Sequence, residues 1–186
     1  GIDVSHETVR FWWNRFGPLF AAEIRKRRVD QRCYSNWRWH LDEVFVRING
    51  ETHYLWRAVD HEGEVLEVFV TKRRDRRAAL KFLKSMMKRY GRPWSIVTDG
   101  LRSYRAATKV VGVSDRHEWG RWLNNRAENS HQPFRRREAA MAQFRAIKTL
   151  QKFASVHASV HNLFNLERHL NQRHIFKQNR SAALAE

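Results

Sequence analysis

Three acidic residues stand where the chain could bring them together. Asp42 lies inside an apolar, strand-like run (HLDEVFVRI), Asp99 ends another (WSIVTDG), and Glu128 lies in an Asn-rich stretch that opens a helix-like segment (NNRAENSHQ). Gathered carboxylates repel one another and raise one another's pKa, so a site that holds them normally includes a cation. Hard divalent ions such as Mg²⁺ prefer oxygen ligands. The three acids therefore predict a divalent-metal site.

The charge of the chain indicates what such a site would act on. Its 186 residues include 36 Lys and Arg against 19 Asp and Glu, a formal net charge of +17. An excess of that size favours a polyanionic partner, because phosphates attract cations and binding releases counterions. A merely basic, ribosomal-type protein is the alternative, but such chains seldom carry ordered carboxylates inside strands. Acidic site and basic surface together point to phosphodiester chemistry on nucleic acid.

Composition excludes several other classes of protein. Cys33 is the only cysteine, which rules out an internal disulfide and a cysteine-based zinc site. A membrane-spanning helix needs an apolar run of roughly 18 residues or more, and the sequence has none. We therefore expect no membrane partner.

The elements that must position the acids can be read from periodicity and turn residues. Asn49-Gly50 predicts a tight hairpin turn between two strands of alternating polarity. Three hairpin-linked strands followed by alternating helices and strands predict an α/β fold, a mixed sheet with helices packed on it. The expected elements are strands over 40–48, 51–60 and 65–72, a helix over 75–91, a strand over 95–99, a helix over 103–111, a short strand over 115–119, and helices over 125–139 and 141–170.

The N-terminal segment predicts a helix of its own. Ser5 is a plausible N-cap, apolar residues follow at helical spacing, and Gly17-Pro18 is expected to end the helix. The segment resembles the second half of a helix-turn-helix, whose first helix would lie before Gly1, although an ordinary amphipathic helix fits equally. The basic stretch that follows could lie along a phosphate backbone or be a solvated charge run. Its candidate DNA-binding residues are Arg25, Lys26, Arg27 and Arg28.

The order of elements and the placement of the acids resemble a known family. They resemble the ribonuclease H-like catalytic core of DDE transposases and retroviral-type integrases, and most closely the insertion-sequence transposases of the IS-six group. The matching segments are WHLDEVFV, YLWRAVD, VTDG and LNNRAE. The resemblance implies a partial helix-turn-helix DNA-binding segment (1–20), a basic linker (21–38), a ribonuclease H-like catalytic core (39–172) and a C-terminal tail (173–186).

The resemblance also implies a mechanism. Asp42, Asp99 and Glu128 match the three catalytic acids, which hold two Mg²⁺ or Mn²⁺ ions in such a family. One ion would activate water or a DNA 3′-hydroxyl for attack on a phosphodiester, and the other would stabilise the leaving oxygen. The implied activity is cleavage at the ends of the element, followed by transfer of the 3′-hydroxyl strand into target DNA.

The resemblance implies partners and a location as well. Double-stranded DNA would be bound both as terminal inverted repeats and as target. Because strand transfer needs two ends held together, a homodimer or larger assembly is expected. The protein would act in the bacterial cytoplasm, associated with the nucleoid.

The third acid is open between two glutamates. Glu128 follows Asp99 after 28 intervening residues, a shorter interval than is usual in the family, whereas Glu138 follows after 38. Each has a basic residue seven positions later, Arg135 or Arg145. The Asn-Asn-x-x-Glu context favours Glu128, and a shorter loop is easily tolerated.

Several polar residues near the acids have both a functional and a structural interpretation. Glu43 should point to the opposite face of the strand from Asp42, as an exposed or paired residue. His131 and Arg135 share a helix face with Glu128 and could contact DNA phosphate, or be solvated. Candidates for general backbone contacts are Arg136 and Arg137, and Asn124 and Asn125 are candidates for capping the helix.

Two other functions remain compatible with the sequence. The chain could be a non-catalytic DNA-binding protein that keeps the fold and the basic surface. It could also be a ribonuclease H or another nuclease, because one fold can serve several functions. Metal-dependent strand joining would separate the transposase from both.

Overall fold

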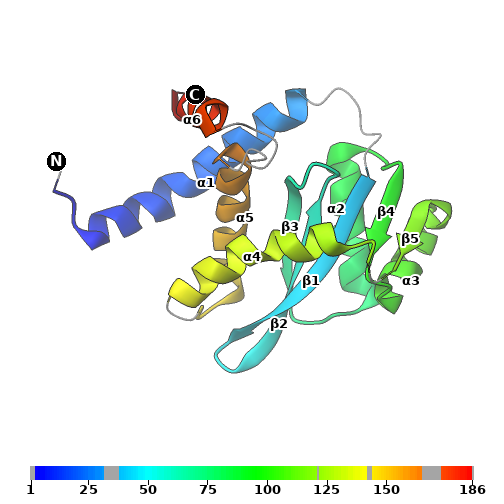
Figure 1. Ribbon diagram of the computed structural model, residues 1–186. Coiled ribbons are helices and arrows are strands. Elements are labelled where there is room, and N and C mark those ends of the chain that lie inside the picture. Colours follow the sequence, from blue (N-terminus) through cyan, green and yellow to red (C-terminus); the bar gives the residue numbers. More distant parts are fainter. Residues whose placement is uncertain (1–2, 32–37, 121, 142–143, 165–172, 186) are drawn as a thin grey trace.

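A mixed five-stranded sheet forms the centre of the molecule in the computed structural model, which describes residues 3–31, 38–120, 122–141, 144–164 and 173–185. The strands lie in the order β3-β2-β1-β4-β5 (Figure 1). Their bounds are β1 Arg38–Ile48, β2 Glu51–Val59, β3 Val65–Thr71, β4 Ser95–Thr98 and β5 His117–Trp119. The first three strands pair antiparallel, and β4 and β5 add parallel on the other side of β1. The predicted α/β fold is confirmed, with β1 in the middle of the sheet.

The hairpin between β1 and β2 is built by its turn residues. Asn49 and Gly50 have φ values of 50° and 81°, the left-handed conformation that the favoured two-residue hairpin turns require. This turn fixes the register of the pair, in which Asp42 lies opposite Arg57. Cross-strand neighbours point to the same face of a sheet, so this register sets which side chain faces the first acid.

Helices cover both faces of the sheet. Helices α2 (Arg76–Tyr90) and α3 (Arg102–Val111) share one apolar cluster with Trp39, Leu41 and Trp56. Helices α4 (Asn125–Ala140) and α5 (Ile147–Phe164) share a second cluster with Val46 and Leu55. Because side chains alternate along β1, odd-numbered residues face α2 and α3, and even-numbered residues, including Asp42, face α4 and α5.

Helix α2 has a capping residue, a buried apolar stripe and a glycine stop, all encoded by nearby residues. Asp75 caps its start, accepting a hydrogen bond from the Ala78 backbone N–H at 2.9 Å. Its buried stripe includes Phe82 and Met86, at helical spacing. Gly91 follows the last turn with a φ of 76°, so the predicted end of the helix is confirmed.

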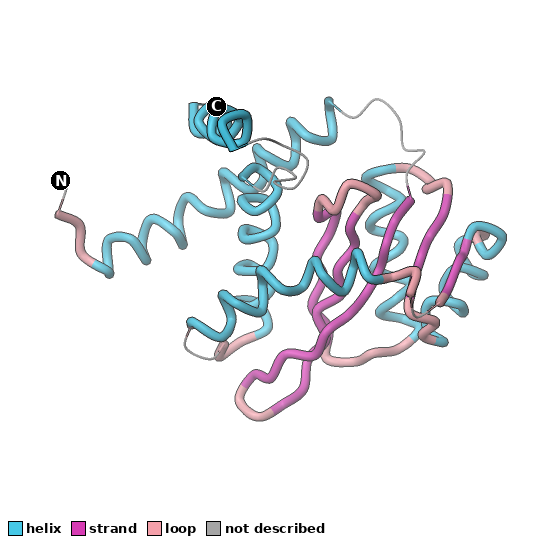
Figure 2. The backbone as a smooth tube through the Cα atoms, in the orientation of Figure 1, coloured by secondary structure: helices cyan, strands magenta, loops and turns pink. Residues whose placement is uncertain are grey.

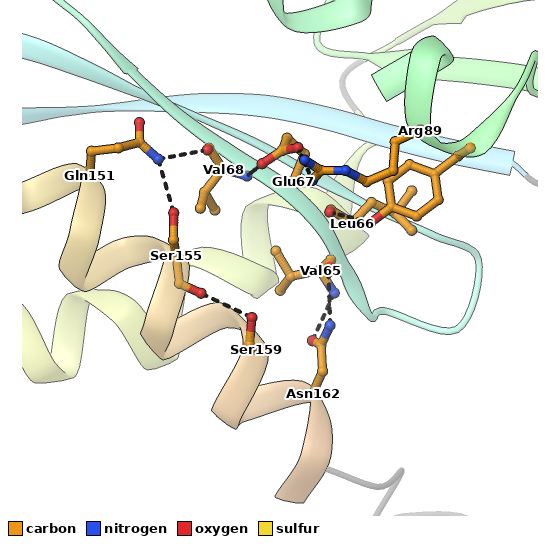
Figure 3. Close-up of polar contacts among 10 residues, drawn as sticks. Val65, Leu66, Glu67, Val68, Arg89, Gln151, Ser155, Ser159 and Asn162 are labelled. Atoms are coloured by element: carbon orange, nitrogen blue, oxygen red, sulfur yellow. Dashed lines mark hydrogen bonds and ion pairs between the residues drawn. The ribbon is translucent and has the colours of Figure 1, made fainter. Parts of the chain in front are cut away.

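Helix α5 covers the free edge of strand β3 with two side-chain amides. Asn162 accepts from the Val65 N–H at 2.9 Å and donates to the Val65 carbonyl at 2.8 Å. Gln151 likewise accepts from the Val70 N–H at 2.8 Å. It also donates to the Val68 carbonyl at 2.9 Å, a contact that Figure 3 shows together with that of Asn162. An uncovered edge would present unpaired backbone groups to other strands. The amides therefore complete the hydrogen bonding that a sixth strand would otherwise provide.

Helix α1 (His6–Gln31) contradicts the prediction that Gly17-Pro18 ends it, since it continues through both residues (Figure 2). A proline inside a helix removes the hydrogen bond to the carbonyl four residues earlier, here Asn14. The ammonium of Lys152 on α5 donates to that carbonyl at 2.6 Å. Gly17 lies where α1 packs against α5, since a Cβ there would be in ordinary van der Waals contact with Val156 at 3.4 Å. Contacts from α5 thus offset the cost of the proline.

Helices extend into both ends of the chain. Residues 21–31, expected as linker, belong to α1, and residues 173–185 form α6 (Arg173–Ala185). Cys33 and linker positions 32–37 lie outside the described residues. Across the described ranges, none of the helices combines the length and apolar character needed to cross a bilayer.

Candidate active site

The first two predicted acids meet because their strands are neighbours. Strands β1 and β4 run parallel, with His40 beside Val97. Asp42 is therefore close to Asp99, which directly follows β4. Carboxylate oxygens of Asp42, Asp99 and Glu43 all lie within 4.8 Å of one another. Ligands of α/β sheets bind outside the carboxyl ends of parallel strands, which is where Asp99 lies.

Glu128 lies on the first turn of α4 and is exposed. The start of this helix is held against β1 by Asn124, a fully buried residue whose Nδ2 donates to the Leu41 carbonyl at 2.8 Å. Asn124 is the N-cap residue of α4, as predicted, but its side chain forms no capping hydrogen bond, because that amide is bonded to β1 instead. Among the described residues, the cluster within 4.8 Å contains Asp42 but not Glu128.

His131 lies one helical turn beyond Glu128 and contacts Asp42. Its Nε2 is 3.2 Å from Asp42 Oδ2, and the residue is only 4% exposed. Burial lowers the pKa of His131, and the neighbouring Asp42 opposes that shift. The imidazole is therefore positioned to orient the Asp42 carboxylate. Because it is buried, little of its surface is accessible to a DNA phosphate.

Arg57 is a buried cation behind the site that sequence reasoning missed. It lies opposite Asp42 on β2 and is 0% exposed. Its three guanidinium nitrogens have no hydrogen-bond partner in the described part of the chain. Burial lowers its pKa to about 10. The sequence does contain a sign of this residue, an arginine inside the apolar run YLWRAVD. A charge within a buried strand is uncommon and therefore points to a special role.

Glu43 faces α2 and α3, as the alternation of the strand predicted, but it is not exposed. Its side chain is 1% exposed and forms an ion pair with Arg74, from the loop between β3 and α2. Burial raises the pKa of Glu43 to about 7; Arg74 opposes this shift, and Asp99 and Asp42 add to it. The paired interpretation is confirmed. The sequence could not single out Arg74 as the partner of Glu43, because it lies among other basic residues in the run KRRDRR.

Arg135 ties α4 to the central strand. Its Nη2 donates to the Phe45 carbonyl at 2.6 Å, and its Nη1 donates to Glu138 at 2.6 Å. Glu138 is thereby engaged in an ion pair on its own helix. Arg135 and His131 both reach β1, at Phe45 and Asp42 respectively. The helix therefore lies along β1 with its first turns at the Asp42 end.

The remaining predicted DNA-binding residues lie away from this cluster of contacts. Arg136 and Arg137 are exposed on the second half of α4. Arg25, Lys26 and Arg27 are on α1, where Arg27 pairs with Glu23 at 2.9 Å. The side chain of Arg28 lies outside the described part of the structure.

The donor set fits a divalent cation. Asp42 and Asp99 supply hard carboxylate oxygens close together, which is what Mg²⁺ or Mn²⁺ requires. The neighbouring start of α4 carries a further exposed carboxylate, Glu128. Gathered negative charge of this kind is unfavourable without a cation.

Comparison with known proteins identifies the family of this chain. A family model described as DDE domain matches residues 36–167. The chain is 31% identical over 157 residues to "Transposase for insertion sequence-like element IS431mec" of Staphylococcus aureus (strain N315), covering 82% of this chain and 68% of the relative. Identity and coverage are the same for "Transposase for insertion sequence element IS257 in transposon Tn4003" of Staphylococcus aureus.

A solved structure supports the fold. The HTLV-2 integrase catalytic core domain in complex with magnesium superposes with a TM-score of 0.50 at 13% identity, covering 74% of this chain and 90% of that one. The molecule thus has the ribonuclease H-like fold of integrase and transposase catalytic cores. With the match over residues 36–167, the chain belongs to the DDE transposase family of insertion sequences, as its motifs predicted.

Proposed function

We propose that this chain cleaves DNA at the ends of its insertion sequence and joins the freed 3′-hydroxyl to target DNA, with two Mg²⁺ or Mn²⁺ ions as cofactors. One observation carries the proposal: Asp42 and Asp99 meet on neighbouring parallel strands, with the start of α4 anchored beside them. The family membership supplies the substrate class.

The site residues have distinct proposed roles. Asp42 and Asp99 hold the metal ions from the sheet, and Glu128 completes the set from α4. Bound divalent ions supply Lewis acidity to a phosphodiester and lower the pKa of an attacking hydroxyl. His131 keeps the Asp42 carboxylate in place. Arg57 contributes fixed positive charge behind it. Partners of this kind, which orient metal ligands, matter nearly as much as the ligands.

The course of α4 supports Glu128 over Glu138 as the third acid. Asn124 is bonded to Leu41, and His131 contacts Asp42, so Glu128 lies between two contacts at the Asp42 end of β1. Glu138 is ten residues further along, which at ~1.5 Å per residue is roughly 15 Å away along the axis. Its carboxylate is also paired with Arg135.

Double-stranded DNA is the proposed partner, as element ends and as target. The net charge of +17 provides general attraction for phosphate. Exposed Arg136 and Arg137 on α4 are proposed backbone contacts, together with the cations of α1: Arg25, Lys26, Arg27 and Arg28. Pairing two element ends calls for a homodimer or larger assembly, acting on nucleoid DNA in the bacterial cytoplasm.

We propose the same four segments that the sequence predicted, and the structure adds that the first two share a helix. The DNA-binding segment (1–20) and most of the linker (21–38) share helix α1 up to Gln31. We propose that they act as one continuous arm in front of the catalytic core (39–172). Residues 173–186 follow the core and carry α6.

The test is joining of a pre-cleaved element end to plasmid DNA, with Mg²⁺ or Mn²⁺. Wild type should join strands, and Asp42→Asn, Asp99→Asn and Glu128→Gln should each lose nearly all joining while still binding DNA. Glu138→Gln is the matched control and should retain activity. Loss in Glu138→Gln alone would move the third acid to that position. Tight DNA binding without joining by the wild type would favour a binding-only protein, and cleavage of RNA–DNA hybrids would favour a nuclease.

A further inference from the structure

One guanidinium lies between two carboxylates at the edge of the acidic cluster. The Nη2 of Arg74 forms the ion pair with Glu43 and lies 3.8 Å from Asp99 Oδ2. Arg74 comes from the loop between β3 and α2 and is 40% exposed. The same cation therefore contacts one acid that is proposed to bind metal and one that is not.

Glu43 is a buried acid with a cationic partner. Its side chain is 1% exposed, and neither carboxylate oxygen has a hydrogen-bond partner in the described residues. The ion pair with Arg74 supplies the positive charge that a buried carboxylate requires. Glu43 consequently holds the guanidinium of an otherwise solvent-accessible loop at the metal site.

We propose that Arg74, held by Glu43, is a built-in counter-cation of the Asp42–Asp99 site and competes there with a divalent ion for Asp99. The inference rests on the proposed metal site. A positive charge within about 4 Å of a carboxylate neutralises it when metal is absent and repels an approaching metal ion. Because Arg74 is partly exposed, its guanidinium can turn toward solvent or a substrate phosphate once an ion takes over the charge of Asp99.

A purely structural role for the pair makes a different prediction. If Glu43 and Arg74 only fasten the β3–α2 loop to β1, removing Arg74 should loosen the loop without strengthening metal binding. A counter-cation should instead lower metal affinity in the wild type. Metal binding itself, measured without DNA, therefore separates the two roles.

The experiment is calorimetric titration of the whole chain with Mn²⁺ alone, for wild type, Arg74→Gln, Glu43→Gln and the double variant. Arg74→Gln should bind Mn²⁺ about tenfold more tightly than wild type, because a nearby positive charge is gone. The control Arg73→Gln, at the exposed neighbour, should change affinity less than about twofold. In the Glu43→Gln background, the effect of Arg74→Gln should fall below about threefold, since the guanidinium is no longer held in place.

Thermal unfolding provides the second measurement. Without metal, Arg74→Gln should unfold at a lower temperature than wild type, because the acids lack their counter-charge, and Mn²⁺ should raise its melting temperature by more. A folded Arg74→Gln variant with unchanged or weaker Mn²⁺ binding would overturn the counter-cation. A full tenfold effect persisting in the Glu43→Gln background would overturn the role of Glu43. If wild type and Asp42→Asn alike bound no Mn²⁺, the proposed metal site itself would fail, and this inference with it.

Discussion

The two faces of the central sheet differ in the kinds of side chain that they bury. Toward α2 and α3 the buried core is dominated by apolar and aromatic side chains: Trp56 packs edge-on against Tyr104 at 5.5 Å and lies 6.3 Å from Phe82. Toward α4 and α5 the core also contains fully or nearly buried polar groups, including Arg57 and His131, whereas Glu43 is the buried acid toward α2 and α3, at the edge of the acidic cluster. Apolar packing stabilises a fold, whereas buried charges without full compensation oppose it.

The two faces therefore have different roles, one in stability and the other in the proposed metal site. The polar groups on the α4 and α5 face gather behind Asp42, where a metal site needs an oriented carboxylate. The apolar face supplies stability that can tolerate them, since proteins commonly accept local cost at functional sites.

The largest effect is expected for Phe82→Ala on the apolar face. Phe82 is 1% exposed, and its removal should lower the free energy of unfolding by about 3–5 kcal/mol through lost burial and a residual cavity. Urea denaturation measures the change. The exposed control Lys84→Ala, on the same helix, should be within about 0.5 kcal/mol of wild type. A loss below about 1 kcal/mol would show that this face is not the main source of stability.

On the opposite face, Arg57→Met should separate function from stability. The substitution replaces a buried cation with an apolar chain of similar length, so the free energy of unfolding should stay the same or rise. Strand joining should fall about 10- to 100-fold, because Asp42 loses the fixed charge behind it. Parallel urea denaturation and joining assays measure both, with exposed Arg47→Met on β1 as control. Wild-type joining by Arg57→Met would contradict the positioning role.

Asn162, which bonds α5 to the edge of β3, is a buried polar residue on the α4 and α5 face with a structural role. Asn162→Leu should leave the N–H and carbonyl of Val65 without this partner, at a cost of about 1–3 kcal/mol for each group left unsatisfied. Light scattering should also reveal association through the uncovered β3 edge. Gln178→Leu, exposed on α6, serves as control. A variant as stable and as monodisperse as wild type would argue that other contacts cover the edge.

The smallest effect is expected from pH. Burial, with a contribution from Arg57, lowers the pKa of His157 and His161 from 6.5 to about 4. The unfolded chain binds protons below about pH 6.5 that the folded chain does not, so stability falls as pH decreases from about 6.5 toward about 4. The melting temperature should therefore be lower at about pH 5 than at about pH 7.5. Replacing both histidines with glutamine should shrink this drop, and exposed His174→Gln should not.

Much of the architecture follows from short stretches of sequence. The Asn49-Gly50 turn and the apolar stripe of α2 depend on residues within a few positions of one another, so the sequence alone predicted them. The place of Asp42 on a strand, and of Asp99 at the end of another, followed from the same local periodicity. Once β1 and β4 are known to be parallel neighbours, the proximity of these two acids follows too.

Local patterns thus predict most of the elements, the fold class and which acids could form a site. Contacts between distant segments carry α1 past Pro18, because the stabilising donor is Lys152, and bond the Asn124 amide to Leu41 rather than to its own helix. They also make Glu43 share Arg74 with Asp99. These contacts join residues far apart in the chain, and their energies depend on burial and charge that no local pattern records.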